Sequence, residues 1–529
     1  MASPTQDRTA SVTPEPQRIA GSDVGDMVSN APSTAEATGP LPAAAVVSAI
    51  GETPAESVET IEALQTVETG GVAEEIAASR GAPTAARRNV IPAASSSPAI
   101  DKSKAAQGTF AALGIRNYRL FWLGQVVSVT GTFMQGTAQQ WLVLTLSKNP
   151  LALGIVGALQ FAPLLLLGPF VGIVVDRWPR RTLLVITQTS ASILAVALWL
   201  LTVTHEVRLW HVFVLAALLG LVNALDMPTR QAFISEMVPT NYLLNAVSLN
   251  SVQFNVARIL GPAVAGALIA LLGVPTLFLL NAISFIAVII GLLMMREAEL
   301  VPIPRSASMD AHGLRRLRAI GDGARFIWNT PSVRVTFLLL TVVGTLGFNF
   351  NVSLPLEATG VLHAGPTVFG LLSSALGVGA LVGALALARR GGAPTNRMLI
   401  GTTLAFGGLE AAIGLTHALP LVMLLIAATG CGMSMFSASA NTRTQLSTPA
   451  EMRGRVMSVY SMIFMGSTPI GNLLVSVVAS TGGVPLSFLV MGVPCVAAGL
   501  VAAWLWRAQP TPTRENVHQG VAQPHALAK

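Results

Sequence analysis

The chain has 529 residues, of which 52% are hydrophobic and only 11% are charged, and its mean hydropathy is +0.63. This balance is typical of a polytopic membrane protein and excludes an ordinary soluble domain, which needs a charged surface. The formal net charge is +7, but the basic residues fall in short clusters between apolar runs instead of one patch, so they indicate membrane topology and not a nucleic-acid partner.

Residues 1–105 differ in composition from the rest of the chain. They are rich in Ala, Ser, Thr, Pro and Glu, with almost no aromatic residues and no sustained periodicity. Such a segment cannot bury enough apolar surface to offset its ordering entropy, so we predict a disordered cytoplasmic tail. Because Met1 is not followed by a basic region leading into an apolar core, we expect the first apolar span to serve as the targeting signal.

Twelve apolar runs separated by short polar breaks follow. A run of about 20 residues is long enough to cross a hydrocarbon core of roughly 30 Å as a helix. The chain is therefore predicted to be an all-α membrane protein with twelve transmembrane helices, followed by a cytoplasmic tail over residues 508–529. The runs lie near 118–145, 151–175, 181–204, 209–231, 243–272, 274–296, 332–357, 366–389, 397–417, 419–441, 453–480 and 483–506.

The basic residues predict the orientation of these helices. With the N-terminus inside, nearly all bases in the breaks fall on the cytoplasmic side, and only Lys148 and Arg208 remain outside. Both termini are therefore expected to be cytoplasmic, in a multi-pass protein of the cell membrane. The break over 297–331 is then a cytoplasmic linker, and its amphipathic pattern predicts a helix on the anionic leaflet. A calmodulin-type docking helix would have a similar pattern.

The two halves of the membrane region, 117–296 and 332–507, resemble each other. The fourth run is followed by PTRQAFISEMVP and the tenth by NTRTQLSTPAEMRGR, and the next run in each half contains proline among small residues. The equivalents are roughly 210 residues apart, as a duplicated six-helix unit would place them. Duplicated halves predict a pseudo-two-fold transporter with a central site.

The break between the second and third runs, GPFVGIVVDRWPRR, has a more specific pattern. Gly168 and Gly172 share one helix face, which predicts close helix contact there. Positive-inside topology with a helix-terminal acid would explain the charges alone. The spacing, however, resembles the signature Gly-x-x-x-Asp-Arg-x-Gly-Arg-Arg of the major facilitator superfamily, with Pro179 in place of its third-position glycine. The residues that match are Gly172, Asp176, Arg177, Arg180 and Arg181.

A finer resemblance concerns RNYRLFWLGQVVSVTGTFMQGTAQQWLVLTL, PTRQAFISEMVPTNYLLNAVSLNSVQFNVARILGPAVAG and RGRVMSVYSMIFMGSTPIGNLL. These stretches are similar to the superfamily branch that contains the enterobactin exporter and macrolide and drug efflux proteins. Gly261, Pro262 and Gly266 match the fifth-helix signature of exporters, Gly-Pro-x-x-Gly-Gly, with Ala265 replacing one glycine. The resemblance implies alternating access by rocking of two six-helix halves, driven by proton antiport. It also implies a monomeric exporter of a bulky amphipathic siderophore or drug.

In the resembled fold, helices one, four, seven and ten line the cavity. Amide side chains are costly against lipid, so we expect the Asn and Gln side chains of these helices to point inward, although each could instead form a hydrogen bond with a neighbouring helix. Together with Phe348, Met433 and Phe436 they predict an adaptable amphipathic pocket. The substrate or coupling candidates are Gln125, Gln135, Gln139, Asn223, Asn349, Asn255, Arg258, Asp226 and Glu357.

Arg258 stands out because, with the fifth run entering the hydrocarbon near Val247, it lies about 16 Å deep, near the bilayer midplane. Snorkelling from that depth is difficult. Ser251, Asn255 and Pro262 share its helix face, so we expect a polar stripe turned toward the cavity. Internal pairing with carbonyls or an acid is the alternative. Acids are scarce at this depth, because Glu410 lies in the ninth run, which is peripheral in the resembled fold.

Other function classes find less support. The histidines are isolated and no cluster of nucleophiles, metal ligands or paired carboxylates occurs, which argues against an enzyme, a metal site or a cofactor. Cys431 and Cys495 lie in apolar runs, as small buried side chains would. A phosphate-binding Gly-x-x-x-x-Gly-Lys-Ser/Thr loop is missing from the sequence, which disfavours ATP-driven transport. A nutrient importer of the same superfamily remains the alternative.

Overall fold

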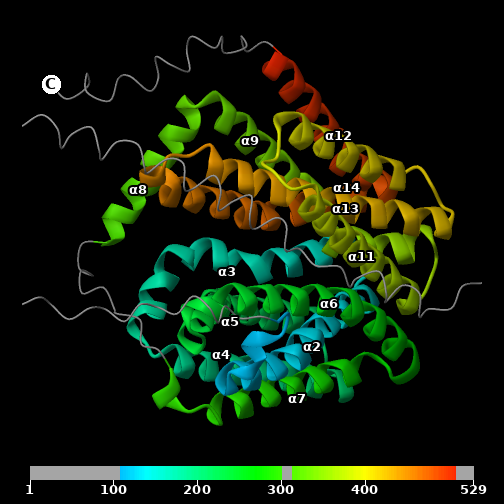
Figure 1. Ribbon diagram of the computed structural model, residues 1–529. Coiled ribbons are helices and arrows are strands. Elements are labelled where there is room, and N and C mark those ends of the chain that lie inside the picture. Colours follow the sequence, from blue (N-terminus) through cyan, green and yellow to red (C-terminus); the bar gives the residue numbers. More distant parts are fainter. Residues whose placement is uncertain (1–107, 301–311, 508–529) are drawn as a thin grey trace, which may run out of the picture. The chain divides into compact units, whose positions relative to one another are not determined.

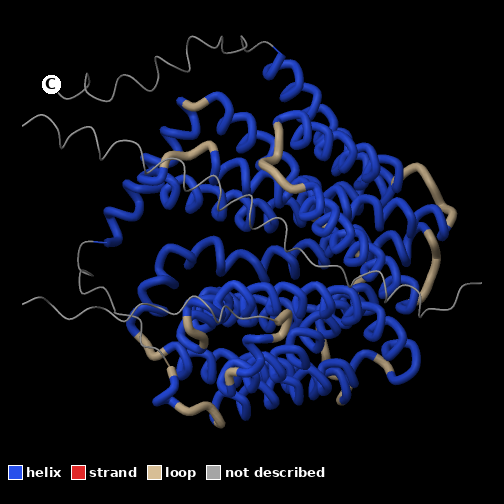
Figure 2. The backbone as a smooth tube through the Cα atoms, in the orientation of Figure 1, coloured by secondary structure: helices blue, strands red, loops and turns tan. Residues whose placement is uncertain are grey.

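The computed structural model describes residues 108–300 and 312–507 (Figure 1). Within these ranges the chain is helical, with loops between the helices and no strand (Figure 2). The two predicted tails, residues 1–105 and 508–529, lie outside the described residues. The first part of the linker, residues 301–311, also lies outside them.

Six helices form the first half, and their ends are set by local sequence. At the start of α3 the Asn149 side chain accepts a hydrogen bond of 2.9 Å from the Leu151 amide, and Pro150 occupies the first turn. The helices are α2 (Arg116–Leu146), α3 (Pro150–Arg177), α4 (Arg180–Val203), α5 (Leu209–Met237), α6 (Thr240–Leu272) and α7 (Val274–Leu293).

The second half has the same order, with an irregular first helix and two helices that run on through a kink. These elements are α9 (Pro331–Val342), η6 (Val343–Gly347), α10 (Phe350–Leu356), η7 (Glu357–Val361), α11 (Pro366–Arg390), α12 (Asn396–Ile413), α13 (Leu419–Leu446) and α14 (Ala450–Arg507). The kink in α14 is at Gly483, so this element contains the eleventh and twelfth spans.

One turn recurs in both halves and supports the duplication. Gly273 separates α6 from α7 with a φ of 79°, and Gly483 divides α14 with a φ of 84°. A side chain would be strained at such angles, so glycine is the residue that permits the break. Val-Pro follows each glycine, and the two positions are roughly 210 residues apart, as a duplicated unit predicts.

The expected twelve transmembrane helices are confirmed. Among the described residues, nine helices are long and apolar enough to cross a membrane. One of these is α14, which holds two spans, and α2 and α12 complete the set. Asn117, at the start of α2, exchanges two hydrogen bonds with the backbone of Arg296, beyond the end of α7. We call this end of the bundle, which carries the linker, the linker end, and the opposite one the far end.

The seventh span is less regular than its apolar run suggests. We expected one helix over 332–357, but α-helical geometry ends at Val342 and gives way to the π-helical turn η6. Phe348 and Asn349 then leave helical geometry before α10 begins, and a second π-helical turn, η7, follows it. Such wide turns in a helix are frequently found at functional sites.

The amphipathic linker helix is present as α8 (His312–Asn329). Part of this helix contacts protein, whereas the sequence predicts that it lies on the leaflet. The helix packs against α14 and α9, with Ile327 buried and Gly323 so close to α14 that a Cβ there would lie 2.7 Å from the Arg455 carbonyl oxygen. The side chains of Asp322 and Arg455 form an ion pair of 3.1 Å. Protein contacts therefore cover part of the face that we had assigned to lipid.

Candidate functional site

The first junction between the two halves is formed by α6 and α11. A Cβ placed on Gly370 would lie 2.3 Å from the Pro262 carbonyl oxygen, and one on Gly266 would lie 2.6 Å from the Pro366 carbonyl oxygen. The Ser374 hydroxyl donates a hydrogen bond of 2.7 Å to the Ile259 carbonyl oxygen. Small residues thus bring the two backbones together, as they do in membrane helix pairs generally.

The second junction pairs α3 with α14. A Cβ on Gly154 would lie 2.3 Å from the Ser476 hydroxyl oxygen, and one on Gly157 would lie 2.4 Å from the Asn472 amide nitrogen. Neither the Asn472 amide nor the Ser476 hydroxyl has a side-chain hydrogen-bond partner among the described residues. The glycines therefore provide hollows that two buried polar side chains of the other half fill.

All these contacts lie toward the far end. α3 and α11 begin there, and the contact residues occupy the first half of each, whereas α6 and the first part of α14 end there and use residues near their ends. On α2, Trp141 stacks on Phe369 with ring centroids 6.4 Å apart. Gln140 donates a bond of 3.4 Å to Asn351. The two halves are thus joined at the far end.

Arg258 lies at the limit of this joined region on the side of the linker end. Its carbonyl oxygen packs near Gly377, and its guanidinium is 3.9 Å from the Met433 sulfur on α13, in the opposite half. No ion pair joins Arg258 to an acid among the described residues. Asn255, on the same face, donates to the Ser251 carbonyl oxygen of its own helix at 2.8 Å and does not bond Arg258.

The three candidate glutamines of α2 bond neighbouring helices of their own half, unlike Gln140, which bonds the other half. Gln135 accepts a bond of 2.7 Å from Asn281 on α7, and Gln139 accepts one of 3.2 Å from Gln160 on α3. Gln125 accepts a bond from the Arg230 guanidinium. The structure therefore favours the alternative of helix–helix bonds for them over side chains pointing into a cavity. Asn223 is exposed.

Asp226 belongs to a buried network inside the first half. Its carboxylate pairs with Arg230 one turn later, and it accepts bonds of 2.8 Å from Thr187 and 2.7 Å from Gln188 on α4. Arg230 links this network to Gln125. With a cation and two donors around it, Asp226 is a fully partnered charge, which is the arrangement that a buried carboxylate needs for stability.

The seventh-span candidates lie in the core of the second half. Phe348 contacts the rings of Phe406, Phe436 and Phe464 at centroid distances of 5.6, 6.2 and 5.7 Å. We call these four residues the aromatic cluster. Phe436 is fully buried, so in this conformation it packs inside the cluster, and its expected role in lining a pocket stays a prediction. Asn349 donates to two carbonyl oxygens of the preceding turn at 2.8 Å.

Two buried carboxyl groups of the second half lack partners. Glu357, in η7, has 1% of its surface exposed, and Glu410, on α12, has 0%. Neither oxygen of either group has a hydrogen-bond partner among the described residues. The ninth span was expected to be peripheral, but Glu410 points into the core. The only sign of this in the sequence is an acidic residue within an apolar run, which would be costly if it faced lipid.

The arginines of the superfamily signature hold the first half together at the linker end. Arg180 donates to Glu236 on α5 at 2.8 Å, and Arg181 donates to the Leu292 carbonyl oxygen at 2.7 Å and pairs with Glu297. Arg177 is exposed at the end of α3, Gly172 is half-buried, and the side chain of Asp176 lies outside the described part. Gly168 makes no close contact, because a Cβ there would meet nothing within 4 Å, and that expectation is wrong.

The exporter-type motif supports close packing on two sides. A Cβ on Gly261 would lie 2.6 Å from the Phe133 side chain of α2, and Gly266 faces α11. Pro262 and Ala265, which lie between them in the sequence, are both buried. The expected close approach at this motif is therefore present, with Gly261 serving the first half and Gly266 the junction.

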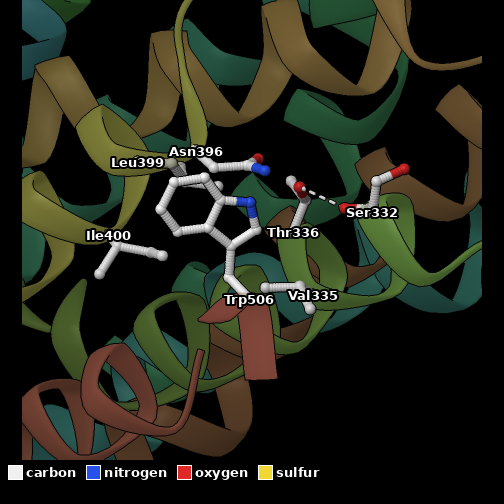
Figure 3. Close-up of a pocket in the computed structure, with 7 residues that line it drawn as sticks. All are labelled: Ser332, Val335, Thr336, Asn396, Leu399, Ile400 and Trp506. Atoms are coloured by element: carbon white, nitrogen blue, oxygen red, sulfur yellow. Dashed lines mark hydrogen bonds between the residues drawn. The ribbon is translucent and has the colours of Figure 1, made fainter. Parts of the chain in front are cut away.

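A small pocket lies at the linker end of the second half, between α9, α12 and the end of α14 (Figure 3). Thr336 donates to the Ser332 carbonyl oxygen at 3.2 Å on one side, and the Trp506 indole closes the other. Its volume of about 10 Å³ leaves room for about one water molecule. It is too small for an organic substrate. Among the described residues no cluster of three or more His, Cys, Asp or Glu could hold a metal ion.

Comparison with known proteins adds sequence relatives to this geometry. The profile of a family described as transmembrane secretion effector matches residues 107–521. The staphyloferrin A transporter of Staphylococcus aureus is 27% identical, over 75% of this chain and 95% of that protein. The multidrug efflux pump Tap of Mycolicibacterium fortuitum is 28% identical (69% and 90%), and macrolide efflux protein A of Streptococcus pyogenes is 22% identical (72% and 93%).

Solved structures show the same fold. A bacterial homologue of the lysosomal transporter Spinster, inward-facing and unoccupied, gives a TM-score of 0.59 at 13% identity, covering 75% of this chain and 99% of that one. A bacterial homologue of the iron transporter ferroportin, also inward-facing, gives 0.58 at 17% identity, covering 74% and 99%.

Proposed function

The chain belongs to the transmembrane secretion effector family of the major facilitator superfamily, and from this membership we propose that it exports a bulky amphipathic small molecule in exchange for protons. Its relatives are named as a siderophore transporter and as drug and macrolide efflux pumps. They are transporters, so we propose no enzymatic role. A siderophore or an antibiotic is the substrate class that we propose.

The observation that carries this proposal is where the two halves meet. They are joined by glycine contacts and a side-chain hydrogen bond in the far part of the bundle, and Arg258 lies where these contacts end. This arrangement supports alternating access, in which the halves rock about a central site that each side reaches in turn. We assign this conformation to the state closed at the far end.

The orientation that we propose places the linker end in the cytoplasm. Nearly all basic residues of the loops are at that end, as the positive-inside rule requires. Both termini are then cytoplasmic, with residues 1–105 and 508–529 as tails and the linker between the halves at residues 297–331. The conformation closed at the far end is, in this orientation, inward-facing.

A topology reporter tests that orientation. Fused near Arg318 in the linker, an enzyme that is active only outside the cytoplasm should give no signal, and the same reporter near Arg208 should be active. A cytoplasm-only reporter at the same two sites should give the complementary pattern. Activity near Arg318 would contradict the twelve-helix orientation.

Arg258 supports an anionic or oxygen-rich substrate. A guanidinium in mid-membrane is costly, and here it has no acid partner among the described residues, only the Met433 sulfur. Its five donors suit carboxylates, hydroxyls and carbonyls. Asp226 and Glu357 are the coupling candidates, and Glu357 is the one with unpartnered oxygens.

Transport in reconstituted vesicles tests the function. The two probes are labelled erythromycin, which is rich in oxygen, and iron-free staphyloferrin A, the siderophore in the name of one relative. Inside-out vesicles should accumulate these compounds when their lumen is acidified. Collapse of the pH gradient should abolish accumulation. Uptake into right-side-out vesicles only would instead favour the nutrient importer.

The signature of the superfamily gives a further test. If Asp176 joins a cytoplasmic charge cluster that stabilises one conformation, Asp176→Asn should reduce transport several-fold while membrane abundance stays largely unchanged. Glu451→Gln, an exposed acid at the linker end of α14, is the control. Unchanged transport by Asp176→Asn at equal abundance would count against a gating role.

A further inference from the structure

Glu410 occupies an unusual position for an acid. It lies on α12, which packs against η6, α13 and α14, and its side chain is fully buried with no hydrogen-bond partner for either oxygen among the described residues. One carboxyl oxygen reaches the backbone of the seventh span (α9, η6, α10 and η7), which we call helix seven and which is not the element α7, since a Cβ on Gly347 would lie 3.4 Å from that oxygen.

Tight packing leaves little space around this carboxyl group. One turn before it, a Cβ on Gly407 would lie 2.7 Å from the Gly492 carbonyl oxygen of α14. On the side of helix seven, the Phe406 ring would be 2.5 Å from a Cβ on Gly347. Backbone and aromatic carbon thus replace water on both sides.

Within residues 108–300 and 312–507, no cation forms an ion pair with the carboxyl group. On the elements packed around Glu410, the titratable group nearest to it is Cys495 on α14, which lies beside Gly407. The others are Cys431 and Arg443 on α13 and Glu451, Arg453, Arg455, Tyr460 and Arg507 on α14. Arg443 donates at 2.9 Å to the Pro394 carbonyl oxygen, near the linker end, and η6 contains no titratable residue. An ionised carboxylate at this place would lose its hydration and gain no partner, so the neutral form is the one that fits.

The contact lies at the break in helix seven. Gly347 ends the π-helical turn η6, and Phe348 of the aromatic cluster follows it outside helical geometry. A second polar atom, the Asn349 amide oxygen, is also left without a partner here. Such irregular turns are points at which a helix changes shape. A change at η6 would therefore move the backbone that covers the Glu410 carboxyl group.

We propose that Glu410 is a proton-binding residue of the transport cycle. It takes a proton from water at the far side, holds it in the conformation closed at the far end, and releases it to cytoplasmic water when helix seven rearranges at η6. The inference rests on the proposed proton coupling and concerns a residue of the ninth span, outside the four helices that line the cavity in the resembled fold.

The test measures a conformational response to pH, with spin labels at the exposed far-end residues Leu272 and Leu415. The background carries Cys431→Ala and Cys495→Ala. In this background with Glu410 intact, raising the pH should deprotonate Glu410. The ratio of molecules closed at the far end to molecules open there should then fall at least tenfold. Glu410→Gln, which is permanently neutral, should stay closed throughout. Glu451→Gln, which changes an exposed acid, should respond like the background, and Glu357→Gln is measured beside it because Glu357 is also a coupling candidate.

Each other outcome overturns the proposal. A normal response by Glu410→Gln would show that the carboxyl group is not the proton-binding group. Loss of the response in Glu357→Gln alone would assign it to Glu357, and a background without a pH response would remove the switch. Transport separates this result from the proposed function, because efflux that ignores the proton gradient refutes coupling whatever the labels show. With coupling intact, Glu410→Gln should lose gradient-driven accumulation and keep exchange.

Discussion

Replacement of Arg258 by alanine is expected to remove most efflux, by about tenfold or more, which corresponds to a loss of at least about 1.4 kcal/mol of interaction. Membrane abundance should stay normal, because no acid among the described residues pairs with the guanidinium and its removal strands no buried charge. The measurement is erythromycin efflux beside the thermal stability of the detergent-extracted protein.

Two further substitutions at this position separate charge from geometry. Arg258→Lys keeps the charge but not the planar fork of donors, so it should recover only part of the efflux. Arg258→Gln should resemble alanine. Arg325→Ala, an exposed arginine of α8, controls for loss of one positive charge. An unstable Arg258→Ala protein would assign the arginine a structural role, and normal efflux would remove it from the substrate path.

The helical layout could be predicted because the bilayer dictates it. Each span must be apolar over about 20 residues and the bases must stay inside, and both signals are strong in this chain. The close packing of Gly261 and Gly266 against neighbouring helices could also be predicted, because small residues in such a motif let two helix backbones approach each other.

Side-chain direction could not be predicted in the same way. Lipid and protein interior are both apolar, so a membrane helix carries little periodicity to show which face is buried. Gln135 therefore looked equally suited to a cavity or to Asn281, which it in fact contacts. Likewise the burial of Glu410 depends on the approach of Gly347 at the break in helix seven, and the apolar run of that span does not reveal a π-helical turn.

The glycine junction between α6 and α11 leads to the second large effect. A methyl group on Gly370 would lie 2.3 Å from the Pro262 carbonyl oxygen and 3.0 Å from the Gly266 Cα, both backbone atoms that cannot rotate away. Gly370→Ala should therefore push the two helices apart, at a cost of roughly 1–3 kcal/mol for overpacking. The overpacking arises only when the far end is closed, since the two glycines belong to different halves.

We therefore expect Gly370→Ala to shift the conformational equilibrium toward an open far end by roughly tenfold to a hundredfold, as about 1.4 kcal/mol per decade requires. Labels at Leu272 and Leu415 report the distance across that end. Gly408→Ala is the matched control, because it makes the same change in a helix where a Cβ meets nothing within 4 Å. An unchanged distance distribution in Gly370→Ala, with Gly408→Ala also unchanged, would show that the two halves do not separate at this junction during transport.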